Sequence, residues 1–181
     1  SHFHGDHYFG LPLLLLRLFF NSVSNQSNSE VLIAGPKDIK NKTREICILA
    51  VSENHPLHEW IETRISFKEI NSEASISIDD KIILKTFPMF HFIETFGFSL
   101  YYENEILFSY FADTIWDDEL LKQIKTFPRA IIADLNGEPS DPVKVHLTDD
   151  DIITNVLPVS KENIVFYGTH LKHQKESLNR I

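Results

Sequence analysis

Side chains that bind metal ions are concentrated at the start of the sequence. Residues 1–7 read Ser-His-Phe-His-Gly-Asp-His, so three imidazoles and one carboxylate lie within six positions. His2 and His4 are two residues apart and project the same way from an extended backbone. Asp6 and His7 follow directly and can turn toward a second point. Because two zinc ions about 3.5–4 Å apart accept such ligands and can share a hydroxide, the segment predicts a site for two cations.

A histidine-rich tag or an exposed turn is the weaker interpretation of this segment. Tags are homopolymeric, whereas this cluster runs straight into the apolar residues 8–16. Together with Gly10-Leu11-Pro12, the segment resembles the signature of the metallo-β-lactamase fold superfamily. The resemblance implies an α/β (α+β) fold, the αββα sandwich, as a single domain over residues 1–181. The family's sandwich has several strands before this loop, so we expect N-terminal strands that this chain lacks.

Three later segments fit the order of ligands that the resemblance implies. His91 lies near the end of a strand-like segment and precedes an aromatic-glycine-aromatic motif at residues 96–98. Asp113 lies in an Ala-Asp-Thr segment where the family has Gly-Asp-Thr, and His170 follows the last hydrophobic strand. Taken singly, a polar strand end or an Asp-Thr cap explains such residues. Their order along the chain favours the metal site.

The resemblance implies a complete set of ligands for two ions. Seven side chains are expected to bind them, and these are His2, His4, Asp6, His7, His91, Asp113 and His170. His91 is expected to join the first two histidines at one ion, and His170 to join the next acid and histidine at the other. Asp113 is expected to bridge the ions, and Asp6 counts as a catalytic residue as well. The expected cofactor is two Zn²⁺, with Mn²⁺ or iron left open.

His146 is not needed as a ligand and is a candidate proton donor. Its segment resembles the His-x-Thr motif of ribonuclease Z and its relatives, in which this histidine donates a proton close to the metals. Ribonuclease Z proper pairs it with a glutamate three residues before the bridging aspartate, but this chain has Tyr110 there. Asp134 and Glu138 are both open as substitutes. The alternative interpretation of His146 is a surface residue just before a helix cap at Thr148.

The length between two proposed ligands bears on the substrate. Bacterial ribonuclease Z inserts a long tRNA-clamping arm between its third histidine and its bridging aspartate. Here residues 92–112, a stretch of 21, separate His91 from Asp113, which is enough for a hairpin. We therefore expect a dinuclear zinc phosphodiesterase that cleaves a small nucleotide or RNA phosphodiester, with His146 as the proton donor. Three alternatives stay open: a tRNA 3′-processing ribonuclease Z, an ester, thioester or lactam hydrolase, and a non-catalytic metal-bound scaffold.

Composition limits the class of protein. The chain has 181 residues, of which 43% are hydrophobic and 24% charged, as expected for one globular domain. The net charge of -9 argues against a broad surface for nucleic acid. The apolar run at residues 11–20 contains Arg17 and is too short to cross a bilayer, so we expect a buried helix and no membrane partner. The single Cys47 favours a reducing compartment, the cytoplasm. A homodimer is left open, because relatives are often dimers.

The remaining sequence alternates between elements that must position these residues. Strands are expected at residues 31–34, 60–70, 74–78, 81–92, 96–103, 106–111, 130–135 and 163–168. Helices are expected at residues 11–20, 38–50, 117–124 and from 149 onward, with Asp38 as the cap of the second. The Asn/Ser-rich residues 21–29 are expected to form a flexible loop. Strands alternating with helices in the second half are typical of an α/β layout.

Overall fold

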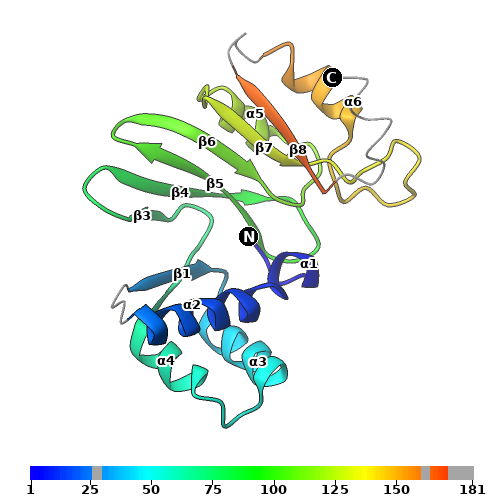
Figure 1. Cartoon of the computed structure of the whole chain (residues 1–181). Coiled ribbons are helices and arrows are strands. Elements are labelled where there is room, and N and C mark those ends of the chain that lie inside the picture. Colours follow the sequence, from blue (N-terminus) through cyan, green and yellow to red (C-terminus); the bar gives the residue numbers. More distant parts are fainter. Residues whose placement is uncertain (26–29, 160–163, 171–181) are drawn as a thin grey trace. The chain divides into compact units, whose positions relative to one another are not determined.

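The computed structural model describes residues 1–25, 30–159 and 164–170 (Figure 1). The chain divides into two compact units, Ser1–Ile70 and Asn71–Ile181. Among the described residues the first unit has a two-stranded sheet and the second a six-stranded sheet. Each unit also has its own cluster of buried apolar side chains. The expectation of a single domain stays a prediction.

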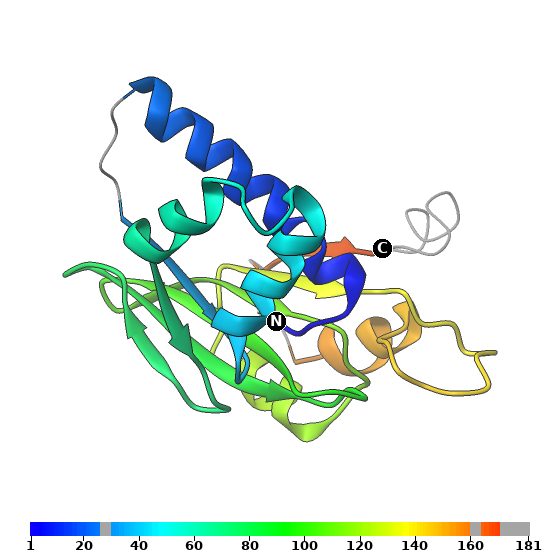
Figure 2. The ribbon, with the colours of Figure 1, turned by 90° about the horizontal axis from the view of Figure 1, so that it is seen from below.

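The first unit consists mainly of helices around a short parallel sheet. Its elements are α1 (Gly5–Tyr8), α2 (Leu11–Asn25), β1 (Val31–Gly35), α3 (Ile39–Val51), α4 (Leu57–Arg64) and β2 (Ile65–Glu69). The long helix α2 packs against α3 and α4, and both of these pack against β2 (Figure 2). The core of this unit is formed by Leu15, Cys47, Leu57, Ile61 and Ile65. Cys47 is fully buried in α3.

The helix after the metal-binding segment is longer and less buried than expected. Leu15 is buried, but Leu13 and Leu14 are largely exposed, so α2 is buried on one side only. The predicted loop is wrong for Asn21–Asn25, which continues the helix. Within this last turn the Ser22 hydroxyl donates to the Phe19 carbonyl, which satisfies a side chain that otherwise favours loops. Residues 26–29 of the predicted loop lie outside the described residues.

The predicted strand at residues 60–70 is wrong in its first half. Residues up to Arg64 belong to α4, and only β2 is extended. Leu57 and Ile61 are four residues apart, so a helix places both on the same side, where they are buried. The period of two seen from Trp60 onward was a chance match to this helical pattern.

The start of α3 lies where it was predicted, but Asp38 does not cap the helix in the expected way. Asp38 precedes the helix as predicted, yet its side chain makes no capping hydrogen bond to the backbone. Its φ is 70°, in the left-handed region, and its carboxylate accepts from the Asn41 side chain instead, at 2.6 Å. The Asp38 amide donates to the Glu69 carboxylate at 2.7 Å, which ties the helix start to the end of β2.

The second unit is built on a mixed sheet. Its elements are β3 (Ser75–Ser77), β4 (Ile82–Met89), β5 (Thr95–Tyr102), β6 (Glu105–Phe111), α5 (Asp118–Ile124), β7 (Ala130–Asp134), α6 (Asp149–Asp151), the π-helical turn η1 (Ile152–Val156) and β8 (Val165–Thr169). The strands lie in the order β3-β4-β5-β6-β7-β8. Pairing is antiparallel from β3 to β6 and parallel from β6 to β8. These elements confirm the predicted ones to within a few residues; Asn163, at the start of the last predicted strand, lies outside the described residues.

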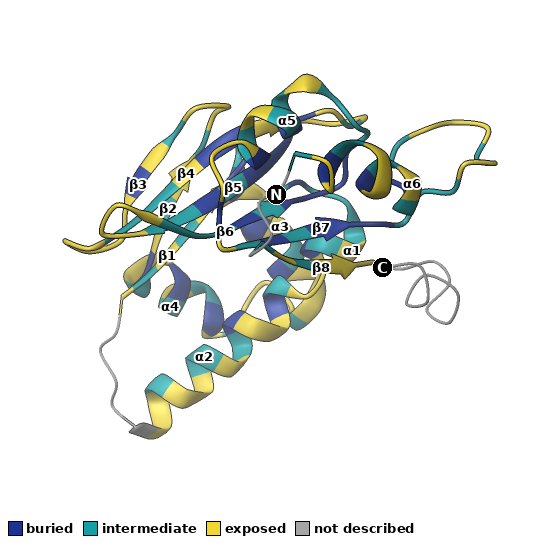
Figure 3. Ribbon diagram, turned by 90° about the horizontal axis from the view of Figure 1, so that it is seen from above, coloured by how far each residue is buried: buried dark blue, intermediate teal, exposed yellow. Residues whose placement is uncertain are grey.

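Apolar side chains from the sheet and from the helices after it form the core of this unit. Phe111 and Ile131 from the strands meet Leu120 and Ile124 from α5 and Ile152 from η1. Buried positions accordingly run along β5 and β7 (Figure 3). This core fixes the positions of the strand ends, where polar side chains can then be presented.

The segment that separates the third predicted histidine from the bridging aspartate is a plain hairpin. Strands β5 and β6 occupy most of residues 92–112 and are joined at the turn formed by Glu103 and Asn104. This confirms the expected hairpin. Among the described residues, no helix is long and apolar enough to cross a membrane.

Candidate metal centre

The direction of the strands brings four polar side chains to one edge of the six-stranded sheet. Strands β6, β7 and β8 run parallel to one another. Strand β4 has the same direction as β6, because both are antiparallel to β5, which lies between them. Their carboxyl ends therefore meet at the same edge. His91 follows β4, Asp113 follows β6, Asp134 ends β7 and His170 follows β8. The carboxyl edge of a sheet is the usual place for a functional site in α/β folds.

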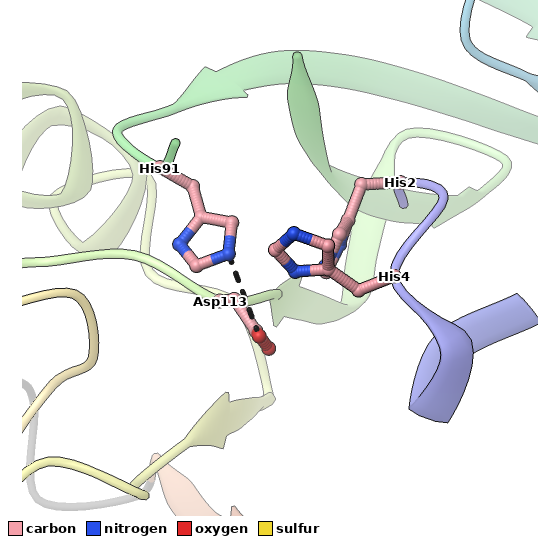
Figure 4. A group of neighbouring side chains, drawn as sticks. All are labelled: His2, His4, His91 and Asp113. Atoms are coloured by element: carbon pink, nitrogen blue, oxygen red, sulfur yellow. Dashed lines mark ion pairs between the residues drawn. The ribbon is translucent and has the colours of Figure 1, made fainter. Parts of the chain in front are cut away.

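His91 and Asp113 face each other at this edge. The Nε2 atom of His91 lies 3.8 Å from Asp113 Oδ2, and both side chains are almost fully buried (Figure 4). The other ring nitrogen of His91, Nδ1, lies 3.3 Å from the Val145 carbonyl. A carbonyl only accepts, so this contact requires a proton on Nδ1; with Nε2 unprotonated, the ring would present a lone pair toward Asp113. This is the tautomer in which a histidine binds a metal through Nε2.

A second group at the same edge comprises two acids and two histidines. Asp113, Asp134, His146 and His170 each offer one donor atom, and these atoms lie within 4.8 Å of one another. His146 Nδ1 is 2.6 Å from Asp134 Oδ2, and His170 Nδ1 is 3.1 Å from Asp134 Oδ1. Both Nδ1 atoms also lie near the Asp113 carboxylate, at 3.8 and 3.9 Å. The second unit thus gathers side chains that could bind a cation or hold one another in place.

The charges of this group favour a bound cation. The side chains of Asp113 and Asp134 are 3% and 1% exposed, so two carboxylates are buried close together. Burial raises the pKa of the Asp134 carboxyl, and the Asp113 charge raises it too, whereas the hydrogen bond from His146 lowers it. Buried carboxylates are stable only with compensating positive charge and hydrogen bonds. An imidazolium or a metal ion supplies that charge.

The first unit carries the other half of the predicted ligands within one short segment. The ring centroid of His2 lies 4.6 Å from that of His4 and 4.3 Å from that of His7. Figure 4 shows the rings of His2 and His4 close together. His4 is extended, with ψ at 150°, and helix α1 begins immediately after it. Asp6 Oδ2 lies 3.7 Å from His7 Nε2 within this helix. The extended backbone followed by a turn is the conformation that the spacing predicted.

The predicted site residues are thus assembled in two sets, one in each unit. His91, Asp113 and His170 meet in the second unit, and the four N-terminal ligands meet in the first. Their roles as ligands stay predictions, as do the catalytic roles of Asp6 and His146. Of the two acids that the sequence left open as partners of His146, distance favours Asp134, whose Oδ2 lies 2.6 Å from His146 Nδ1.

Asp134 is the one residue of the group that sequence reasoning named only as an alternative. It ends a strand of apolar residues that pairs in parallel with β6, whose end carries Asp113. An acid at the end of such a strand was the available signal. Tyr110 occupies the position of the glutamate that ribonuclease Z has before its bridging aspartate. Its ring packs against Phe98 on the neighbouring strand β5, at 5.4 Å between centroids.

Comparison with known proteins places this geometry in context. The family model of the Anti-Pycsar protein Apyc1 matches residues 1–180. Ribonuclease Z of Pediococcus pentosaceus is 37% identical over 99 residues, covering 54% of this chain and 28% of that protein. The human zinc phosphodiesterase ELAC protein 1 is 27% identical over 131 residues, covering 55% of this chain and 36% of that protein. The chain thus spans about a third of the length of these curated relatives.

Solved structures show the same fold. The metallo-β-lactamase fold protein YhfI from Bacillus subtilis has a TM-score of 0.70 at 12% identity, covering 99% of this chain and 68% of that one. The short form of human tRNase Z has a TM-score of 0.61 at 20% identity, covering 93% of this chain and 71% of that one. The predicted fold class is confirmed. With the family match over nearly its whole length, the chain belongs to the Anti-Pycsar protein Apyc1 family and has the metallo-β-lactamase fold.

Proposed function

We propose that the whole protein is a dinuclear zinc phosphodiesterase that cleaves a small nucleotide or RNA phosphodiester. The observation that carries the proposal is the group of Asp113, Asp134, His146 and His170 at the carboxyl edge of the sheet. Relatives named ribonuclease Z and zinc phosphodiesterase support a metal-dependent hydrolase acting on phosphodiesters. The buried Cys47 supports a reducing compartment, for which we propose the cytoplasm. A homodimer is compatible with this function and is not required by it.

The donor atoms suit zinc. Neutral imidazole nitrogens and carboxylate oxygens are its ordinary ligands, and the contact of His91 Nδ1 with a carbonyl supports a tautomer that leaves Nε2 available. In the proposal His91 would hold one ion together with His2 and His4. Asp6, His7 and His170 would hold the other ion. Asp113 would be a ligand of both, and the family match over residues 1–180 supports combining the ligands of both units.

The chain's own residues would then divide the remaining chemistry. Zinc bound at such a site supplies a hydroxide near neutral pH, because it lowers the pKa of water to about 7, and offsets charge on phosphoryl oxygens. Asp6 would bind metal and accept a proton of the water. His146 would protonate the departing oxygen, since Asp134 occupies its Nδ1 and leaves Nε2 for the substrate.

The surroundings of His146 favour a small substrate. A pocket of about 400 Å³ in the second unit is lined by His146, Trp116, Lys144 and Thr148, among others. That volume is at the lower end of pockets that bind small molecules. The hairpin formed by β5 and β6 takes the place at which ribonuclease Z has its tRNA-clamping arm. A cyclic nucleotide or a short phosphodiester is therefore favoured over tRNA.

The proposal is tested on the full protein with metal analysis and a substrate panel. Two zinc ions per chain are expected, together with hydrolysis of bis-p-nitrophenyl phosphate and of at least one cyclic mononucleotide or dinucleotide. Cleavage of precursor tRNA alone would instead support ribonuclease Z activity, and cleavage of thioesters or lactams alone a different hydrolase. Two tightly bound ions without any turnover would support the scaffold.

A further inference from the structure

The two oxygens of Asp134 contact two different imidazoles. Oδ2 accepts from His146 Nδ1 at 2.6 Å, and Oδ1 lies 3.1 Å from His170 Nδ1. We propose that Asp134 is a positioning residue that orients the proton donor and a metal ligand at the same time. This inference rests on the proposed function, in which these two histidines have those roles.

One carboxylate can serve both histidines because each needs the same thing from it. A proton held on Nδ1 by an acceptor fixes the ring and turns Nε2 outward. For His170, a proton on Nδ1 toward Asp134 Oδ1 would leave the lone pair of Nε2 for a metal, and the carboxylate would make it a stronger ligand. For His146 the same contact stabilises the imidazolium, whose Nε2 proton is then delivered to the departing oxygen.

The position of Asp134 is itself fixed by the sheet. Asp134 pairs in register with Thr169, directly before His170. The Leu135 amide donates to the Thr169 carbonyl at 3.0 Å, which ties β7 to β8 at this point. The Asn136 amide donates to Asp134 Oδ1 at 3.2 Å, so the carboxylate is also held by its own chain.

The backbone of His170 indicates that its contacts hold it in place. Its φ is 57°, in the left-handed region that is uncommon for residues other than glycine, although histidine enters it more often than most. Such a conformation persists where surrounding interactions determine it. The contact with Asp134 is one of these interactions, and it keeps the ring at the edge of the sheet.

The competing interpretation is that Asp134 and His146 are metal ligands themselves. Their atoms belong to a group that could hold an ion. However, zinc bonds of about 2.0–2.1 Å in tetrahedral geometry keep ligand atoms about 3.3 Å apart. Asp134 Oδ2 and His146 Nδ1 are 2.6 Å apart, which is the distance of a strong hydrogen bond. The geometry therefore favours positioning over ligation.

The first test needs no turnover. Nitrogen-15 spectra of the histidine rings are recorded for the zinc-loaded full protein and for Asp134→Ala, with His146→Ala and His170→Ala as assignment controls. We expect the Nδ1–H signals of His146 and His170 to shift or to be lost in Asp134→Ala. Asp80→Ala removes an exposed acid from the turn before β4 and should leave them unchanged. If Asp134→Ala keeps both signals, the inference is wrong.

The second test separates proton donation from metal binding. Thymidine 5′-p-nitrophenyl phosphate releases a phenolate that needs no proton, whereas the dinucleotide TpT releases an alkoxide that does. For Asp134→Ala we expect kcat on TpT to fall by about 10²–10⁴-fold, with a much smaller change for the phenolate substrate and for KM. Zinc affinity should weaken by about 10–100-fold. Combining Asp134→Ala with His146→Ala should cost little more than His146→Ala alone on TpT.

Other outcomes have separate meanings. Equal loss on both substrates, with one zinc ion absent at saturating zinc, would make Asp134 a ligand and overturn the inference. Asp134→Asn keeps the shape of the side chain and one acceptor oxygen, so it should retain one of the two ring signals. This variant also controls for misfolding of Asp134→Ala. If the wild type cleaves neither substrate, the proposed function fails, while the ring spectra still decide the role of Asp134.

Discussion

The two sets of predicted ligands are built in opposite ways. In the first unit, His2, His4 and His7 come together because one extended segment turns into helix α1. In the second unit, Asp113 and His170 meet only because distant strands end at the same edge of a sheet. The first set thus depends on a few backbone angles, and the second on strand register and on the core beneath it. The two should therefore fail under different substitutions.

Removal of the shared acid should have the largest effect. Asp113 contacts both His91 and His170, so Asp113→Asn weakens the whole set in the second unit. Because bound zinc supplies several kcal/mol of stabilisation to the reaction, we expect kcat/KM to fall by at least about 10³-fold. Metal analysis should show less than two zinc ions per chain. Full activity with two ions would exclude Asp113 as a ligand.

A substitution in the local set should cost activity while leaving the sheet intact. For His4→Ala we expect one zinc ion to be lost and kcat/KM to fall by about 10²–10³-fold, since a predicted ligand is removed. In the metal-free protein the urea midpoint should stay within error of the wild type, because His4 is not one of the buried residues that form the core of either unit. His58, a half-buried histidine of α4 whose Nε2 lies 2.8 Å from the Ser52 carbonyl, is the matched control, and His58→Ala should keep both ions. A large fall in metal-free stability would show that His4 has a structural role.

The same difference explains which parts of the site the sequence could predict. His2 to His7 were readable from spacing, because two-residue steps on an extended backbone fix directions. His91, Asp113 and His170 were found through the order that the family resemblance implies. The pairing of Asp134 with His146 could not be chosen over Glu138, because it depends on the end of β7 and on the loop that returns through residues 137–147.

The fold was predictable where the spacing of apolar residues along the chain matches the positions that are buried. The strands of the second unit alternate or are continuously apolar, and they were placed to within a few residues. The strand predicted for residues 60–64 is wrong because polar and apolar residues in a short helix can alternate by chance. Only the burial of Leu57 and Ile61 reveals the helical period. The loop predicted for Asn21–Asn25 is wrong because a helix that has formed over the preceding apolar turns can continue into Asn/Ser-rich residues, which composition alone does not reveal.

A core substitution should disturb the second set without touching any ligand. Ile131 on β7 is fully buried among the residues of the core. Ile131→Ala should lower the free energy of unfolding by about 2–5 kcal/mol, because it leaves a cavity under the strand that carries Asp134. Ile132 points to the other face and is only partly buried, so Ile132→Ala should cost less. Urea denaturation measures both, and equal losses would contradict the assignment of the two faces.

The smallest expected effect concerns the helix that follows His146. The Thr148 hydroxyl accepts from the Asp151 amide at 3.1 Å, and the Asp151 carboxylate accepts from the Thr148 amide at 2.9 Å, which together form a capping box. Thr148→Ala should lower the free energy of unfolding by about 1 kcal/mol, measured by urea denaturation. Thr126→Ala removes an exposed hydroxyl that caps no helix start and should change it by less than about 0.5 kcal/mol. The cap lies two residues after His146, so Thr148→Ala is also assayed for kcat on TpT. A fall in kcat that is larger than the loss of folded protein explains would show that the cap also orients the His146 ring. The second set would then depend on this loop as well as on the strand ends.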